Sequence, residues 1–202
     1  MKIIFATGNR NKLREIKGIM AGEDVEIVTA SDEGIDVDPE ETGDSFEENA
    51  LIKARAVYAL SDKTSIVLAD DSGLCIDALG GEKGELGIHS ARFMGHDTSY
   101  DIKNREILRR MADVPDEKRT ARFACAIAAI FPGDGREVVV RETMEGYVAH
   151  EIAGGNGFGY DPVFYLPEFG MNSAEISAES KNLISHRGKA MRHISAIIKE
   201  TM

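Results

Sequence analysis

Apolar residues along this chain repeat with two different periods, and the order in which these periods alternate constrains the fold more than any other feature. Short runs rich in β-branched residues predict strands, whereas apolar residues three or four positions apart predict helices. The predicted strands are residues 2–6, 25–29, 65–69, 75–79, 122–130 and 137–141, and the predicted helices are residues 13–20, 46–58, 101–111 and 185–199. Pro132–Gly135 lies between the last two strands and is a strong hairpin signal. Strand–helix units with a central antiparallel hairpin predict an α/β protein with a mixed sheet rather than a uniformly parallel one.

The length and composition are those of a globular protein. The 202 residues suffice for two lobes that share a core, and no linker or repeat divides them, so residues 1–202 are predicted to form a single domain. The chain is 43% hydrophobic and 29% charged, which excludes a disordered or fibrous protein. Its apolar runs are shorter than the roughly 18 residues of a membrane span, and its two cysteines are isolated. We therefore predict a cytoplasmic protein that does not bind a membrane.

The acidic residues are unevenly distributed. The net charge is −11, and twelve acidic residues but no lysine or arginine lie between residues 18 and 52. In the rest of the chain, 23 acidic and 24 basic residues nearly balance. An acid excess excludes a protein that coats nucleic-acid polymers, because such proteins need clustered Lys and Arg. Most of the twelve acids are expected to be solvated, and a metal ligand among them is possible.

Two segments combine a strand end with groups suited to phosphate and metal chemistry. The segment TGNRNK, residues 7–12, lies between a strand and a helix, where unpaired amide groups and Lys12 suit an anion. Asp70 and Asp71 are predicted to close the strand at residues 65–69, with one carboxylate facing a cleft and the other held by the structure. A carboxylate there can bind magnesium and activate a water molecule. The alternatives are a purely structural junction for the first segment and an Asx-capped turn for the second.

Two later segments are suited to binding the base of a nucleotide. Residues 154–162 place Phe158 among glycines, so its ring is free to lie against a planar base, although a tight hairpin with buried aromatic rings explains the pattern as well. His186 and Arg187 start the last helix, where cations oppose the helix dipole. We therefore expect a bound anion or an electron-rich carbonyl group at this helix start.

Six segments together resemble the inosine triphosphate pyrophosphatase family, also called the non-canonical purine NTP pyrophosphatases. In chain order they are TGNRNK, FEENALIKA, DDSGL, HSAR, GFGYDP and SHRGKA, and they extend from Thr7 to Ala190. Leu86 departs from the family pattern, because many relatives have proline there. The resemblance implies an α/β fold with an elongated mixed sheet and two lobes around a nucleotide-binding cleft. It also implies a homodimer that uses Mg²⁺ to hydrolyse ITP, dITP and XTP to the monophosphate and pyrophosphate.

The resemblance also implies a role for individual residues. Asp71 would accept a proton and bind the metal, with Glu40 as the second metal ligand and Glu41 or Glu47 as the next candidates. The residues implied to bind substrate are Thr7, Gly8, Asn9, Arg10, Asn11, Lys12, Lys53, Ser72, Phe158, Gly159, Tyr160, Asp161, Lys181, His186 and Arg187. Donors from Lys181, His186 or Arg187 aimed at the 6-oxo group of the purine would reject ATP, which has a donor at that position.

Two other functions are compatible with the same residues. One is a housecleaning pyrophosphatase for modified pyrimidine nucleotides, which a panel of nucleotide substrates distinguishes from a purine enzyme. The other is a regulator that binds a nucleotide without catalysis. The adjacent carboxylates of Asp70 and Asp71 disfavour the regulator, because binding alone needs no group that activates water.

Overall fold

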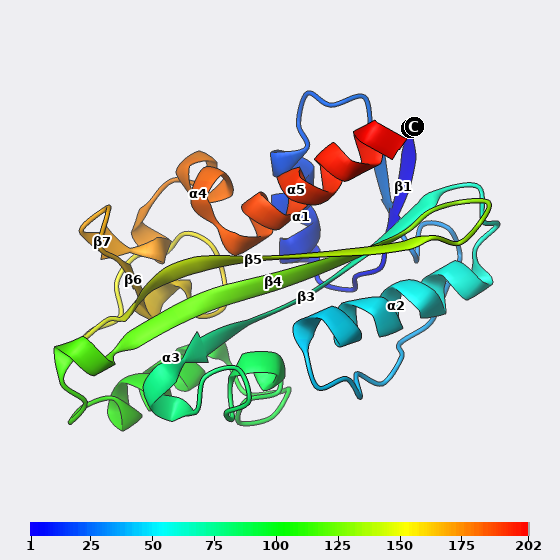
Figure 1. Ribbon diagram of the computed structural model, residues 1–202. Coiled ribbons are helices and arrows are strands. Elements are labelled where there is room, and N and C mark those ends of the chain that lie inside the picture. Colours follow the sequence, from blue (N-terminus) through cyan, green and yellow to red (C-terminus); the bar gives the residue numbers. More distant parts are fainter. Residues whose placement is uncertain (202) are drawn as a thin grey trace. The chain divides into compact units, whose positions relative to one another are not determined.

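A computed structural model describes residues 1–201 and shows a mixed α/β fold (Figure 1). The strands in this range are β1 (Lys2–Phe5), β2 (Glu26–Thr29), β3 (Ile66–Ile76), β4 (Thr120–Ile130), β5 (Glu137–Val148), β6 (Phe164–Leu166) and β7 (Met171–Asn172). The α-helices are α1 (Arg10–Ile19), α2 (Phe46–Leu60), α3 (Tyr100–Arg110), α4 (Ala178–Ile184) and α5 (His186–Thr201). The strands are hydrogen-bonded in the order β2-β1-β3-β4-β5-β6-β7. Strand β1 pairs in parallel with β2 and β3, whereas β6 pairs antiparallel with β5 and β7, so the prediction of a mixed sheet is confirmed.

The chain divides into two compact units. Unit 1 comprises Met1–Asp71, Cys125–Glu142 and the chain from Arg187 onward, and unit 2 comprises Ser72–Ala124 and Thr143–His186. Three strands, β3, β4 and β5, contribute residues to both units. The division places Asp71 at the end of a segment of unit 1 and Ser72 at the start of a segment of unit 2.

Unit 1 has a core formed by strand residues and two helices. Helix α5 contributes buried residues three and four positions apart, as a helix with one apolar face requires. The main members of this core are Ile3, Phe5, Ile16, Ile66, Leu68, Met191, Ile194 and Ile198. Burial of each such side chain stabilises the fold by about 1.5–3 kcal/mol relative to exposure. The core therefore fixes β3, α1 and α5, which carry Asp70, Asp71, Lys12 and Arg187.

Unit 2 has a separate core around the second half of β3. Helix α3 contributes Ile107 to it, and strand β6 contributes Phe164 and Leu166. The main members are Leu74, Ile76, Phe93, Ile107, Met111, Phe123, Phe164 and Leu166. This core supports the glycine-rich segment that precedes β6.

The structure corrects several predicted element ends. Strand β3 continues through Asp70 and Asp71 to Ile76, so the prediction that these carboxylates close the strand is wrong. The reason is that each carboxylate pairs with a lysine side chain within the strand. Strand β5 is longer than predicted, and β6, β7 and α4 were not predicted. Ser45 caps α2 as predicted, since its hydroxyl accepts a hydrogen bond from Glu48 N at 3.2 Å.

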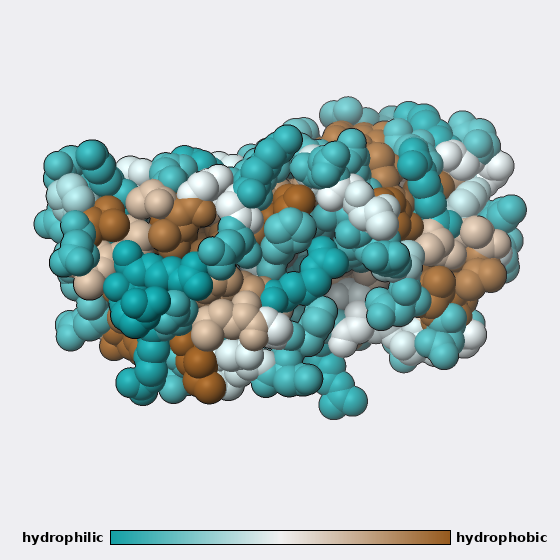
Figure 2. Space-filling view, turned by 90° about the horizontal axis from the view of Figure 1, so that it is seen from below, coloured by the Kyte–Doolittle hydropathy of each residue, from teal (hydrophilic) through white to brown (hydrophobic). Residues whose placement is uncertain are grey.

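The surface is predominantly hydrophilic on the face shown in Figure 2, where hydrophobic residues form separate small areas. Within residues 1–201, every helix is too short or too polar to cross a bilayer.

Candidate active site

Two consecutive aspartates of β3 contact different cations. Successive side chains of a strand point to opposite faces, so Asp70 and Asp71 leave β3 in opposite directions. Asp70 Oδ2 lies 2.9 Å from Lys12 Nζ, and Asp71 Oδ1 lies 2.8 Å from Lys53 Nζ. The two carboxylates therefore have different lysine partners, and the expectation that one of them faces a cleft stays a prediction.

Asp70 pairs with cations of two helices within unit 1. Besides Lys12 of α1, it accepts hydrogen bonds from Arg187 Nε and Nη2 of α5 at 3.3 and 3.2 Å. Arg187 also pairs with Glu15, which lies one turn after Lys12 on α1. Burial opposes ionisation of Asp70, but Lys12 and Arg187 hold its pKa below the ordinary value. Asp70 is thus an ionised carboxylate that joins α1, β3 and α5.

Arg187 corrects one sequence argument. The start of α5 was expected to need a bound anion because cations oppose the helix dipole there. For Arg187 the carboxylates of Asp70 and Glu15 already compensate the charge within the chain, so the helix dipole alone does not require a ligand there. The guanidinium is almost completely buried with these two partners.

Asp71 has a different environment, which includes an acidic residue of the preceding loop. Lys53 Nζ of α2 lies between Asp71 Oδ1 and Glu41 Oε1, the latter at 2.7 Å. Burial lowers the pKa of Lys53, but the surrounding carboxylates, chiefly Asp71, outweigh it and raise the pKa. Burial raises the pKa of Asp71, and the charges of Lys53 and Lys12 only reduce this rise. Asp71 is therefore the carboxylate whose charge is less fully compensated.

One oxygen of Asp71 is suited to a ligand. Among the described residues, no donor lies within hydrogen-bond distance of Asp71 Oδ2, although this atom is buried. A buried carboxylate oxygen without a partner is costly unless a cation or donor satisfies it. Among residues 1–201, no group of three or more His, Cys, Asp or Glu side chains is arranged to hold a metal ion. This donor set fits Mg²⁺, which commonly takes one or two protein carboxylates and completes its shell with water and phosphate oxygens.

The three candidates for the second metal ligand differ in position. Glu41 lies beside Lys53 and is half-buried, whereas Glu40 is exposed. The third candidate, Glu47, pairs with Arg141 Nη1 at 3.3 Å. Within unit 1, Glu41 is therefore the acid that shares a cation with Asp71.

The segment TGNRNK forms the start of α1 and is partly self-capped. Asn9 Oδ1 accepts hydrogen bonds from Asn11 N and Lys12 N, and Thr7 Oγ1 accepts one from Asn9 N. Gly8 and Arg10 are exposed, and within residues 1–201 no heavy atom lies within 4 Å of a Cβ built on Gly8. The turn thus presents an open backbone surface beside Lys12.

In unit 2, Asp161 organises the glycine-rich segment. Its Oδ2 accepts hydrogen bonds from Lys181 Nζ at 2.6 Å and from Phe158 N at 2.8 Å. Its Oδ1 accepts one from Ser173 Oγ at 2.9 Å. Lys181 Nζ also lies 5.3 Å from the centre of the Phe158 ring, within the range of a cation–π contact. An ammonium group and an aromatic ring are therefore held side by side.

Two predicted substrate residues of unit 2 lie in its core. The side chain of Tyr160 is buried, and its hydroxyl donates to Ser90 O at 2.6 Å. The ring of His186 stacks on Phe123 with centroids 4.9 Å apart and an interplanar angle of 10°. Sequence reasoning missed Ser90 as a partner, although the HSAR segment that contains it was noted.

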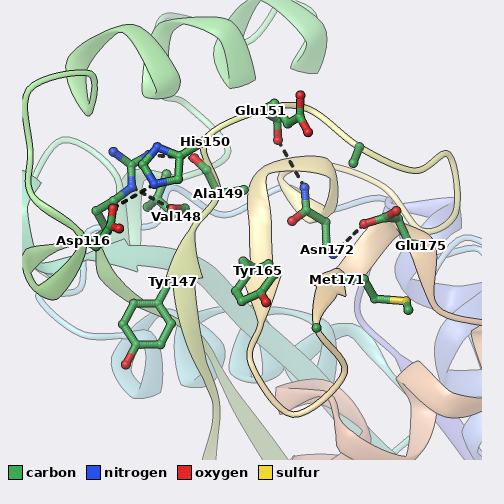
Figure 3. A pocket seen from close by; sticks show the side chains of 13 residues that line it. Asp116, Tyr147, Val148, Ala149, His150, Glu151, Tyr165, Met171, Asn172 and Glu175 are labelled. Carbon is green, nitrogen blue, oxygen red and sulfur yellow. Dashed lines mark hydrogen bonds and ion pairs between the residues drawn. The ribbon is translucent and has the colours of Figure 1, made fainter.

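A separate cavity of about 490 Å³ lies in unit 2 and contains none of the predicted site residues (Figure 3). Tyr147, Tyr165 and Asn172 line it together with His150 and Asp116, an exposed pair joined by a hydrogen bond. The amide group of Asn172 donates to Glu151 O and Pro162 O, so it serves the loop structure. The buried Arg119 also lines this cavity, but its guanidinium donates to the main-chain oxygens of Met111, Val148 and Ala149, so it too serves the loop structure.

Comparisons with known proteins agree with this chemistry. Residues 3–197 match the Ham1 family. A protein of Caldanaerobacter subterraneus subsp. tengcongensis, named dITP/XTP pyrophosphatase, is 45% identical over 200 residues, which are 98% of this chain and 96% of that protein. A dITP/XTP pyrophosphatase of Treponema denticola is also 45% identical, over 98% of this chain and 99% of that protein. Among solved structures, the Ham1 protein of Staphylococcus aureus has a TM-score of 0.85 at 36% identity, and the match covers 100% of both chains.

Proposed function

Because this chain belongs to the Ham1 family, we propose that it hydrolyses ITP, dITP and XTP to the nucleoside monophosphate and pyrophosphate. The resemblance to the inosine triphosphate pyrophosphatases is confirmed by these relatives. The observation that carries the proposal is the environment of Asp71, a buried carboxylate with one oxygen on Lys53 and the other without a partner in residues 1–201. We place this activity in the cytoplasm.

The residues of unit 1 suit the triphosphate. Lys12 and Lys53 supply positive charge, and the exposed backbone at Gly8 lets phosphate oxygens approach the start of α1. Asp71 would accept the proton of a water molecule that attacks the α-phosphorus, because its second carboxylate oxygen is buried and has no donor within residues 1–201. Water attack in line with departing pyrophosphate requires positioning and charge neutralisation more than covalent chemistry.

Asp71 and Glu41 would hold the divalent metal, which we propose to be Mg²⁺. When bound, Mg²⁺ supplies positive charge to the phosphate oxygens as negative charge develops on them. Lys53 contacts both carboxylates and so keeps them close together in unit 1.

The residues of unit 2 suit a purine base. The Phe158 ring offers a flat apolar surface, and Lys181 offers an ammonium group with three N–H donors. A 6-oxo group accepts hydrogen bonds, whereas the 6-amino group of adenine donates them, so Lys181 would favour ITP and XTP over ATP. Direct contacts of Ser72, His186 and Arg187 with the substrate stay predictions, as does a homodimer.

The products of ITP hydrolysis test the proposal. Incubation with ITP and Mg²⁺ is expected to give IMP and pyrophosphate, which ion-exchange chromatography separates from IDP and orthophosphate. Formation of IDP and orthophosphate would contradict attack at the α-phosphorus. Faster turnover of dUTP or dTTP than of ITP would instead support the pyrimidine alternative, and tight nucleotide binding without turnover would support a regulator.

A pair of glutamine variants tests the second metal ligand. Glu41→Gln is expected to raise the Mg²⁺ concentration for half-maximal activity by about tenfold or more, since loss of an oriented ligand group weakens metal sites by roughly that factor. Glu40→Gln is the matched control, because Glu40 is an adjacent but exposed acid, and its Mg²⁺ dependence should stay within about twofold of wild type. A raised Mg²⁺ requirement in Glu40→Gln and an unchanged one in Glu41→Gln would identify Glu40 as the ligand instead.

A further inference from the structure

The glycine-rich segment is attached to the core of unit 2 through Tyr160. This tyrosine is only 4% exposed and donates its hydroxyl to the main-chain oxygen of Ser90 at 2.6 Å. Its ring also packs edge-on against Tyr100, with centroids 5.1 Å apart and an interplanar angle of 84°. Tyr160 follows Gly159 and precedes Asp161, so this attachment lies in the middle of the segment that carries Phe158 and the lysine-binding carboxylate.

Ser90 is attached in turn to strand β3. Its buried hydroxyl accepts a hydrogen bond from Leu74 N at 2.9 Å and donates one to Gly87 O at 2.7 Å. The turn approaches β3 so closely that a Cβ on Gly73 would lie 2.1 Å from Gly87 O and 2.6 Å from Ser90 Oγ. Only glycine at position 73 is compatible with this approach.

Helix α3 provides a second attachment point. Asn104 is buried and donates from Nδ2 to Gly159 O at 3.1 Å. The segment is therefore held at two consecutive residues, Gly159 by α3 and Tyr160 by Ser90. These two hydrogen bonds, at consecutive residues, restrict both the position and the orientation of the peptide group that joins Gly159 to Tyr160.

We propose that Ser90 and Tyr160 are positioning residues for purine recognition. Ser90 contacts β3 two residues after Ser72 through its hydroxyl, and contacts the glycine-rich segment through its carbonyl oxygen. One buried residue thus sets the spacing between a predicted substrate contact and the Phe158–Asp161 segment. Discrimination between bases needs donors held to within a fraction of an ångström, because misplacement by about 1 Å can cost about 100-fold in rate. This inference rests on the proposed hydrolysis of purine nucleotides.

Tyr160→Phe tests the inference by removing one hydroxyl while leaving the packed ring in place. We expect kcat/KM for ITP to fall about tenfold, mainly through KM, because Ser90 O loses its donor and the segment loses its anchor. The preference for ITP over ATP should fall as well, since the donor for the 6-oxo group is no longer held in place. Tyr147→Phe is the matched control, as this tyrosine of the same unit is 38% exposed in the cavity of Figure 3, and its kinetics should equal those of wild type.

Ser90→Ala provides an independent variant. It leaves the carbonyl oxygen in place but removes the hydroxyl that binds Leu74 N. If both variants act on the same attachment, the double variant should lose less than the product of the two single losses. The ITP-to-ATP ratio of kcat/KM does not depend on the folded fraction, so a purely structural role predicts equal losses for both substrates.

The outcomes separate this inference from the proposed function. If wild type releases no pyrophosphate from ITP, the proposed function fails and the inference fails with it. If wild type is active but Tyr160→Phe and Ser90→Ala keep the wild-type ratio of ITP to ATP, only the inference is overturned. A reduced ratio in both variants, with Tyr147→Phe unchanged, supports it.

Discussion

Asp71→Asn is expected to lower kcat for ITP by about 10²- to 10⁴-fold, the range over which a positioned general base accelerates proton transfer. Asparagine has nearly the same shape as aspartate but accepts a proton poorly and binds Mg²⁺ weakly. The change leaves Lys53 paired with Glu41 at 2.7 Å, so no cation is left alone in the site. The melting temperature should therefore stay close to that of wild type, which circular dichroism measures alongside pyrophosphate release.

Asp113→Asn is the control for this variant, because Asp113 is an exposed aspartate of unit 2 and is predicted to have no role in catalysis. Its kcat should equal that of wild type. The Mg²⁺ concentration is varied in both cases. If kcat of Asp71→Asn returns to the wild-type value at high Mg²⁺, the role of Asp71 is limited to metal binding. If kcat stays within about twofold of wild type at all Mg²⁺ concentrations, Asp71 has no role in the chemical step.

The fold was predictable where local pattern and burial agree. The run at residues 65–69 is apolar and β-branched, and it forms the first part of β3. The continuation of β3 through Asp70 and Asp71 was not predictable, because it depends on Lys12, Lys53 and Arg187, which come from distant helices. Strands β6 and β7 contain three and two residues, too few for a period of two to be recognised.

The segments that form the candidate site were predictable from their motifs, but the individual residue that takes part within an irregular segment was not. The segments around Lys12 and Lys53 are recognisable in the sequence, and the structure places both lysines on the aspartates of β3. Choosing between Glu40 and Glu41 requires the path of an irregular loop, where side chains follow no period. Glu15 had no recognisable signal either, since its partner Arg187 lies 172 positions away.

The adjacent residues Asp70 and Asp71 of β3 thus differ in role, the first in stability and the second in the proposed catalysis. Asp70 pairs with both Lys12 and Arg187, and these two cations lower its pKa although the side chain is buried. Asp71 has a raised pKa and one buried oxygen without a partner in residues 1–201. Substitution of the first should therefore affect stability most, and substitution of the second should affect turnover most.

Asp70→Asn is accordingly expected to destabilise the protein by about 3–5 kcal/mol, the usual cost of removing one partner from a buried ion pair. Arg187 would keep Glu15 but lose its contacts with β3, and Lys12 would lose the carboxylate 2.9 Å away. At about 2–4 °C per kcal/mol for a chain of this size, the melting temperature should fall by roughly 10 °C. Glu137→Gln is the control, because it breaks a pair with Arg55 that is exposed, and exposed pairs contribute only about 0–1 kcal/mol. A melting temperature for Asp70→Asn as close to wild type as that of Glu137→Gln would show that the Asp70 network does not hold α1, β3 and α5 together.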